Sequence, residues 1–236
     1  MSRFRLNLRR FGLALFVVGV SHLASPQASA VTWGAAAPLA GGRDSHTMTL
    51  LPTGKVLVTG GRNTAGVAYA STELFNPLTQ TWSAGAPLPA ARFFHTATLL
   101  LNGKLLVAGG LSGSATLDSS ALYDPVTDTW TAGSNLNRGR DSFTATLLTN
   151  GKILAAGGFI GSGITASAEL YDPATGMWTL TANPLHTAHS KHTATLLPNG
   201  KVLAAGGYDG STDLTSAELY GEKSGLPPLL LLLLDN

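Results

Sequence analysis

Residues 95–110, HTATLLLNGKLLVAGG, hold two apolar segments around an Asn-Gly pair and end in a double glycine. The same pattern occurs four times, and its glycine pairs end at intervals of 49, 48 and 49 residues. The four tryptophans keep the same period, with intervals of 49, 48 and 48 residues. Self-similarity at a fixed period of this length is typical of repeat architectures. The chain therefore consists largely of four copies of one unit.

Each unit predicts four short strands. The first two flank an Asn-Gly pair in three units and Thr53-Gly54 in the first. Asn-Gly between apolar segments is the strongest short-range signal for a β-hairpin because both residues tolerate positive φ. The third strand ends at an Asx-Pro pair such as Asp124-Pro125, which starts a turn into a fourth strand that carries the tryptophan. A repeated four-stranded meander of about 50 residues is typical of a propeller blade. The predicted fold class is all-β, a β-propeller built from four four-stranded blades.

The units resemble kelch repeats. The resemblance rests on the double glycine after an apolar strand, the aromatic residue before Asp-Pro, and a tryptophan about twenty residues after the glycines. It covers nearly all of residues 31–220. It implies a β-propeller similar to the central domain of galactose oxidase, with roles that range from protein-binding platforms to sugar-active enzymes. The resemblance therefore determines the fold more closely than the function.

The repeat landmarks are interpreted first as structural residues. A glycine pair lets the second strand approach a crowded axis without a Cβ atom, and a tryptophan fills the space between neighbouring blades. A regular column of tryptophans is also compatible with a platform that stacks on carbohydrate. The landmarks are Gly60, Gly61, Gly109, Gly110, Gly157, Gly158, Gly206, Gly207, Trp33, Trp82, Trp130 and Trp178.

A second column of residues stands three positions before His46 and its equivalents: Arg43, Arg92, Arg140 and His189. In kelch-like propellers the turn that enters the first strand borders the central channel, so these side chains are candidates for a binding ring at one channel mouth. The structural alternative is that they cap strand ends and pair with carbonyl groups or with Asp44 and Asp141.

No catalytic, metal-binding or cofactor-binding residue is predicted. The chain has no cysteine, which excludes thiolate zinc sites, cysteine nucleophiles and the tyrosine–cysteine cross-link of a galactose-oxidase copper centre. His186, His189 and His192 suggest a metal site, but a spacing of three in a turn does not converge three rings on one point. Residues 209–213 resemble part of a calcium loop but lack its other acidic ligands.

The segments that vary between units lie between the second and third strands, at residues 62–70, 111–118, 159–166 and 208–215. They are rich in Ser, Thr, Gly and Ala and include Tyr69, Phe159 and Tyr208. Loops on a rigid scaffold are where binding usually resides. These loops are the predicted contact surfaces.

The strand inventory leaves ring closure open. Val31–Trp33 reads as a fourth strand without its own first three, and the last unit ends at Ala217–Tyr220 without a fourth strand. Pairing of these two segments would close a four-bladed ring, whereas their separation would leave an open arc of a larger propeller. Residues 221–236 form an irregular, leucine-rich tail that departs from the repeat.

The N-terminus predicts export. Residues 1–30 comprise an arginine-rich start, an apolar run of about ten residues and a small-residue end at Ala28-Ser29-Ala30, the order of a secretory signal peptide. The run is too short to span a bilayer. The segment carries four of the 15 basic residues and none of the 13 acidic ones, so the remainder has a net charge of −2. No nucleic-acid partner is expected from such a balance.

The predicted function is a secreted, non-catalytic interaction module, extracellular or periplasmic, that needs no cofactor and binds a protein or glycan ligand. No membrane span is expected once the signal is removed. The alternative is a propeller domain or truncated fragment of a carbohydrate-active oxidase or hydrolase.

Overall fold

The computed structural model describes residues 32–221. The predicted signal peptide, residues 1–30, and the leucine-rich tail beyond Gly221 lie outside the described residues. The chain forms two units, Met1–Ala35 and Ala36–Asn236, and every strand belongs to the second. The described residues form strands and turns without any helix, so none of them provides a helix that could cross a membrane.

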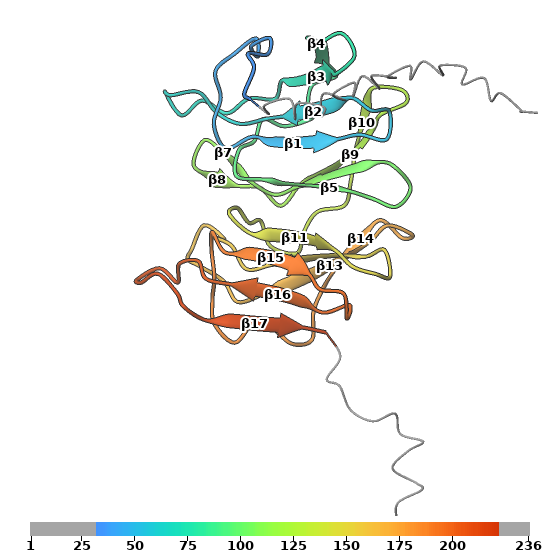
Figure 1. Ribbon diagram of the computed structural model, residues 1–236. Helices are drawn as coiled ribbons and strands as arrows, with labels where there is room; N and C mark the ends of the chain where they lie inside the picture. The colour runs from blue at the N-terminus through green and yellow to red at the C-terminus, as the bar shows by residue number, and fades with distance from the viewer. Residues whose placement is uncertain (1–31, 222–236) are drawn as a thin grey trace, which may run out of the picture. The chain divides into compact units, whose positions relative to one another are not determined.

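Four antiparallel sheets, one per sequence unit, make up the second unit (Figure 1). Blade 1 contains β1 (Thr47–Leu50), β2 (Val56–Thr59), β3 (Thr72–Asn76) and β4 (Thr81–Gly85). Blade 2 contains β5 (Thr96–Leu99), β6 (Leu105–Ala108), β9 (Ser120–Asp124) and β10 (Thr129–Ala132), with a small hairpin of β7 (Leu111–Ser112) and β8 (Ala115–Thr116). Blade 3 contains β11 (Thr144–Leu147), β12 (Ile153–Ala156), β13 (Ala168–Asp172) and β14 (Met177–Leu180). Blade 4 contains β15 (Thr193–Leu196), β16 (Val202–Ala205) and β17 (Ala217–Tyr220).

The hairpins between the first two strands form where the sequence predicts them, but by a different turn. In blade 2, Gly103 N donates to Leu100 O at 3.0 Å, and only the glycine has positive φ, at 80°. This is a type I turn followed by a left-handed glycine, the usual geometry of a three-residue hairpin loop. The asparagine contributes through its side chain, since Asn102 Oδ1 accepts from Lys104 N at 3.1 Å. The predicted hairpin is therefore confirmed, and of the two residues that tolerate positive φ only the glycine adopts it.

The turns between the third and fourth strands follow the Asx-Pro prediction. Asp124 Oδ1 accepts a hydrogen bond from Val126 N at 3.0 Å, and the equivalent bonds occur at Asn76 and Asp172. A short carboxylate or amide side chain that bonds the backbone two residues ahead fixes the first half of such a turn.

Neighbouring blades pack face to face, because successive side chains of each strand point alternately to the preceding and the following blade. We call these the backward face and the forward face of a blade. Leu105 and Val107 on β6 pack backward against Leu57 of blade 1, whereas Leu106 and Ala108 pack forward into the cluster of blade 3. Blades 2 and 3 are thus apolar on both faces, which explains why β6 and β12 are buried along their whole length.

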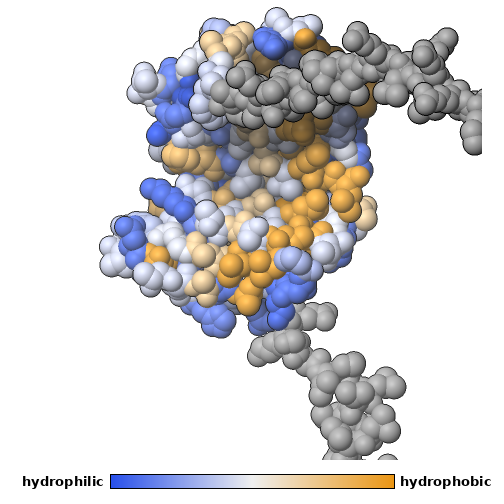
Figure 2. Space-filling view, in the orientation of Figure 1, coloured by the Kyte–Doolittle hydropathy of each residue, from blue (hydrophilic) through white to orange (hydrophobic). Residues whose placement is uncertain are grey.

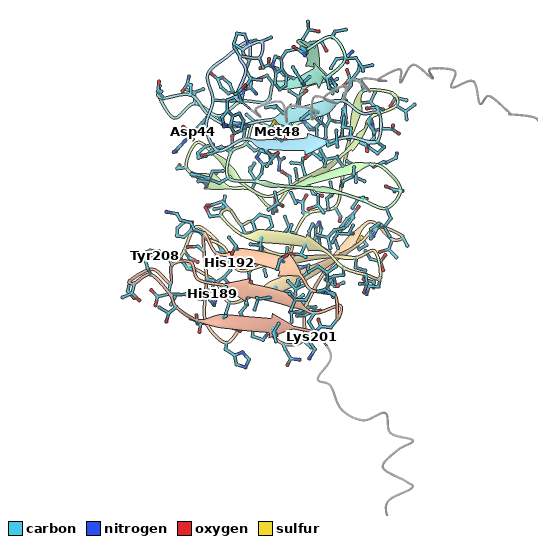
Figure 3. All side chains as sticks on the ribbon, in the orientation of Figure 1. Asp44, Met48, His189, His192, Lys201 and Tyr208 are labelled. Carbon is cyan, nitrogen blue, oxygen red and sulfur yellow. The ribbon has the colours of Figure 1, made fainter. Side chains whose placement is uncertain are left out.

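The row of four blades has two open ends. Leu74 packs on the forward face of blade 1 and is 7% exposed, while its equivalent in blade 4, Leu219, is 58% exposed. On the backward face of blade 1, Met48 and Leu50 are 65% and 64% exposed (Figure 3). Within residues 32–221, no strand pair and no core cluster joins blade 1 to blade 4.

The all-β blade architecture is as the sequence predicts, and no closed ring forms among the described residues. β17 pairs only with β16, and Thr32 and Trp33 belong to no strand. Val31, the first residue of the predicted closing strand, lies outside the described residues.

Candidate functional site

The predicted column of Arg43, Arg92, Arg140 and His189 lies inside the blades. Arg92, Arg140 and His189 are buried, and so is the guanidinium of Arg43. Each side chain donates to the carbonyl oxygen of the first glycine of its own blade's pair, at 2.7–3.1 Å. The three arginines also donate to the carbonyl of the serine that precedes the third strand, at 2.9–3.3 Å. The column therefore ties the entry of each blade to the ends of its second and third strands.

The expectation of a binding ring at a channel mouth is wrong for this column, because its side chains are buried and donate to internal acceptors; Arg140 Nε alone is buried without a partner in this column. The structural alternative is correct about the carbonyl groups, to which these side chains donate. It is wrong about Asp44 and Asp141, since Asp44 bonds Ser45 and Arg62, and Asp141 bonds Ser142. Burial lowers the pKa of Arg92 to about 10, which is still far above neutrality, so the group stays charged.

The carboxylates that do serve the column are Glu73, Glu169 and Glu218, which the sequence analysis missed. Arg140 and Glu169 form a fully buried pair at 2.7 Å, and Arg43 pairs with Glu73 at 2.6 Å. Each carboxylate also accepts backbone N–H groups from the linker that enters the blade, as Glu169 does from Asn137 N and Arg138 N at 2.7 and 3.2 Å. The signal was available as a glutamate in the second position of the third strand.

Blade 2 lacks this carboxylate, and the linker explains why. Ala121 stands where the other blades have glutamate, and Pro89 stands where Ala40, Asn137 and His186 donate their N–H groups. A proline has no N–H to offer. Donor and acceptor are therefore missing together in the same blade.

The glycine pairs allow two close approaches in each blade. The second glycine donates its N–H to the next blade, as Gly61 N does to Arg92 O at 2.9 Å and Gly110 N to Arg140 O at 2.8 Å. A Cβ atom on Gly110 would lie 2.7 Å from Phe93 O, closer than real Cβ contacts come. Gly206 of blade 4 is the exception among the first glycines, since an added Cβ would meet nothing nearer than 3.7 Å.

The tryptophans differ in burial according to their blade. Trp178 is 5% exposed in the cluster between blades 2 and 3, and Trp130 packs on the cluster between blades 1 and 2. Trp82 Nε1 and Trp130 Nε1 donate to Ala37 O and Ala86 O at 2.8 and 2.9 Å. A carbohydrate-stacking platform does not fit Trp178, because its ring is covered. Trp33 is fully exposed.

Four residues with left-handed backbone, one beside the first strand of each blade, are joined to one another by hydrogen bonds between blades. Ser45, Phe94, Ser142 and Lys191 each precede that strand by two residues, and all have φ between 52° and 55°. Phe94 N donates to Ser45 O, Ser142 N to Phe94 O and Lys191 N to Ser142 O, at 2.9–3.1 Å. Left-handed backbone in residues other than glycine costs energy and is found at functional sites. Sequence reasoning missed this feature because the four residues share no side-chain type.

Three of these strained residues line a pocket of about 490 Å³ at the loop end of blades 3 and 4. Its walls include Phe94, Phe159, Ile164, Lys191 and Tyr208, three of which belong to the predicted contact loops. Figure 3 shows Tyr208 at the opposite end of blade 4 from Lys201, which follows the hairpin turn. Loops and linkers therefore form one face of the blades, and the tight turns form the other.

Asp141 is the one carboxylate in this pocket, and it is incompletely bonded. The residue is 4% exposed; its Oδ1 accepts from Ser142 Oγ at 2.8 Å, and its Oδ2 is buried without a partner. Burial raises the pKa of Asp141, although the bond from Ser142 and the charge of Lys191 oppose the rise. A buried acceptor without a donor is costly, and this one belongs to a residue that lines the pocket.

The comparison with family models agrees with the repeat geometry. The KLHDC2/KLHL20/DRC7 Kelch-repeats domain matches residues 20–207. The chain belongs to the kelch-repeat family. No curated protein matches it as a relative.

The remaining polar clusters of the kelch blades are local. His186 Nδ1 and His189 Nε2 lie 3.0 and 3.2 Å from the carboxylate of Glu218, while His192 Nε2 lies 3.0 Å from Thr144 Oγ1 of blade 3. Figure 3 shows His189 and His192 on blade 4. Within residues 32–221, no group of three or more His, Asp or Glu side chains is arranged to hold a metal ion. Asp209 accepts hydrogen bonds from Ser211 and Thr212 in its own turn.

Proposed function

We propose that the chain is an exported, non-catalytic kelch module that binds a protein segment in the pocket between blades 3 and 4. Kelch-repeat domains are generally interaction modules that bind protein partners. The observation that carries the proposal is Asp141 Oδ2, a buried acceptor without a donor in a loop-face pocket. A peptide N–H or a hydroxyl of the partner satisfies this oxygen.

The walls of the pocket define the rest of the partner's chemistry. Phe94, Phe159 and Tyr208 offer aromatic surface, and Lys191 places a positive charge at the rim. Rigid aromatic anchors around a buried polar group are typical of the centres of protein interfaces. The segment that fits best has an apolar side chain, a hydrogen-bond donor beside it, and an acceptor or negative group facing Lys191.

Site-specific photo-cross-linking tests the location. A cross-linking residue at Phe159 is expected to capture the partner from the compartment into which the chain is exported, while one at Val126, exposed on the turn face, is not. With the captured protein purified, Asp141→Asn is expected to weaken binding about tenfold or more, the cost of a hydrogen bond to a charged group. Asp213→Asn, on an exposed part of the neighbouring loop, is the matched control.

Equal affinity of the Asp141→Asn variant and the unchanged chain would refute the pocket assignment. Displacement of the partner by a free oligosaccharide would identify the ligand as a glycan, because exposed aromatic side chains beside a carboxylate also suit a sugar.

Export is part of the proposal and has its own measurement. The order of charged, apolar and small residues in residues 1–30 supports cleavage after Ala30. N-terminal sequencing of the exported chain is expected to begin at Val31. A product that starts at Met1 would contradict export by this route.

A further inference from the structure

Each internal junction of the row joins the forward face of one blade to the backward face of the next. Among residues 32–221, one face of each kind has no neighbouring blade: the backward face of blade 1 and the forward face of blade 4. Because both belong to the same repeat, they match each other as the internal faces do. We propose that blade 4 of one copy packs on blade 1 of a second copy, and that two copies close a ring of eight blades.

The free face of blade 1 carries the side chains that a preceding blade covers elsewhere. Met48 and Leu50 correspond to Ala97 and Leu99 of blade 2, which pack against the cluster shared with blade 1. Phe75 corresponds to Tyr123, which is fully buried at that junction, yet Phe75 is only half-buried. The face is therefore uncovered at Met48 and Leu50, whereas Val58, opposite Met48 on the same face, is buried.

The free face of blade 4 shows the complementary deficit. Leu219 corresponds to Leu74, Leu122 and Leu170, all of which pack forward into a core cluster, whereas Leu219 is exposed. The space beside Gly206 is open where the other first glycines meet a carbonyl of the following blade. Apolar residues reach the surface over β15 and β16 (Figure 2). Exposed apolar faces on a repeat array mark places where packing continues.

The strands present in each blade favour a second copy of the chain as the partner that covers the free faces. In every internal junction the linker that enters a blade follows a strand of the preceding blade, as residues 86–92 follow β4. Residues 37–43 are the equivalent linker of blade 1, so Thr32–Gly34 belong by register on the blade before it. Among the described residues, which end at Gly221, the blade 4 sheet has three strands and no such outer strand. A second copy supplies the missing strand and the missing face together.

Self-closure of one chain is the competing arrangement. It would bring together two faces that the structure leaves apart, and all three internal junctions would have to be re-angled. Those junctions are held by core clusters and by the bonds that link Ser45, Phe94, Ser142 and Lys191. Eight blades lie within the range that propellers adopt. A heterologous interface of this kind forms a ring when its rotation closes.

The first test is the mass of the purified chain in solution. Sedimentation or light scattering is expected to give twice the chain mass at micromolar concentration. Leu219→Glu and Met48→Glu are each expected to give monomers, because each places a charge in the proposed interface. Val126→Glu, at an exposed apolar position away from both end faces, is expected to remain a dimer. A monomeric unchanged chain, or an open polymer, overturns the ring.

The second test fixes the register between copies. Ser83 pairs with Leu74, Thr131 with Leu122 and Thr179 with Leu170, so Gly34 of one copy is expected opposite Leu219 of the other. Because the chain has no cysteine, a Gly34→Cys chain mixed with a Leu219→Cys chain reports only this contact. A disulfide-linked heterodimer supports the proposal, since such a bond needs Cα atoms within about 7 Å.

The matched control is Gly34→Cys mixed with Val126→Cys, which is expected not to link. If the mixed chains do not link, while a chain carrying both Gly34→Cys and Leu219→Cys forms an internal disulfide as a monomer, the ring closes within one chain and the proposal fails. These tests need no knowledge of the loop-face partner, so their outcome is independent of the proposed function.

Discussion

Blades 2 and 3 differ from blades 1 and 4 in burial far more than in sequence. All four carry the same apolar positions, but Leu122 and Leu170 are covered by a neighbouring blade while Leu219 is not. The difference comes entirely from position in the row. In a repeat protein the interface between units supplies much of the stability, so identical residues have unequal energetic value. The predictions below measure that inequality.

The largest effect is expected at a tryptophan between inner blades. Trp178→Ala removes a ring that is 5% exposed, and it is expected to lower the free energy of unfolding by about 3–5 kcal/mol. Trp33→Ala is the matched change at a fully exposed tryptophan, and in the monomeric Leu219→Glu background it is expected to change stability by less than about 0.5 kcal/mol. Denaturant unfolding measures both, and equal losses would contradict the comparison.

The buried ion pair of blade 3 gives the next effect. Glu169→Ala leaves Arg140 without its carboxylate and leaves two linker N–H groups without an acceptor. Breaking one partner of a buried pair typically costs about 3–5 kcal/mol, and Arg140 keeps its carbonyl contacts, so the lower end is expected. Unfolding of this variant in denaturant measures the loss.

Blade 2 provides a further test, since it lacks both the glutamate of the third strand and the linker N–H group that donates to it. Ala121→Glu alone is expected to destabilise the chain, because Pro89 offers no N–H to the new carboxylate. Combination with Pro89→Ala is expected to recover part of the loss. Additive effects in that double-mutant cycle would show that the two positions are not coupled.

The sequence predicts the features of a blade that depend on local residues, but not those that depend on contacts between distant segments. The period of the glycine pairs and tryptophans predicts the strands, the hairpins and the blades, because each depends on local turn chemistry and alternation. The periodic pattern does not show which way Arg92 or Arg140 points, and so their buried clamp was interpreted as a candidate binding ring. The pocket beside Asp141 is lined by residues from blades 2, 3 and 4, and no local sequence pattern shows that these segments meet.

The open end of blade 4 carries a titratable contact that links stability to pH. Burial alone would raise the pKa of Glu218, but hydrogen bonds from His186 N and Thr187 N, and from the rings of His186 and His189, outweigh it and lower the pKa to about 2. A carboxyl whose folded pKa lies below its unfolded value, near 4.5, stabilises the fold above that value. This stability is lost as the pH falls from about 4.5 to about 2.

The variant Glu218→Gln isolates this contribution. Its stability is expected to fall less steeply than that of the unchanged chain over that acid range, by about 1–2 kcal/mol once solvent screening is allowed for. Parallel pH profiles of the two chains would mean that the contact contributes nothing. Asp209, whose pKa hydrogen bonds from its own turn also lower to about 2, contributes equally to both chains and cancels in the difference.

The smallest effect is expected at Asp141, where the sign is opposite. Burial raises the pKa of this carboxyl above its unfolded value, so its contribution to stability is fullest below the unfolded pKa and is lost as the pH rises through the folded pKa. Asp141→Asn removes that dependence, and the stability of the variant relative to the unchanged chain is expected to increase between pH 4 and pH 7. Denaturant unfolding at both values measures the change. A variant that is less stable at pH 7 would mean that Asp141 Oδ2 is bonded within the fold, and the pocket would then have no free acceptor for a ligand. A stable variant that has lost its partner would separate binding from folding at Asp141, whose Oδ2 is buried without a hydrogen-bond partner.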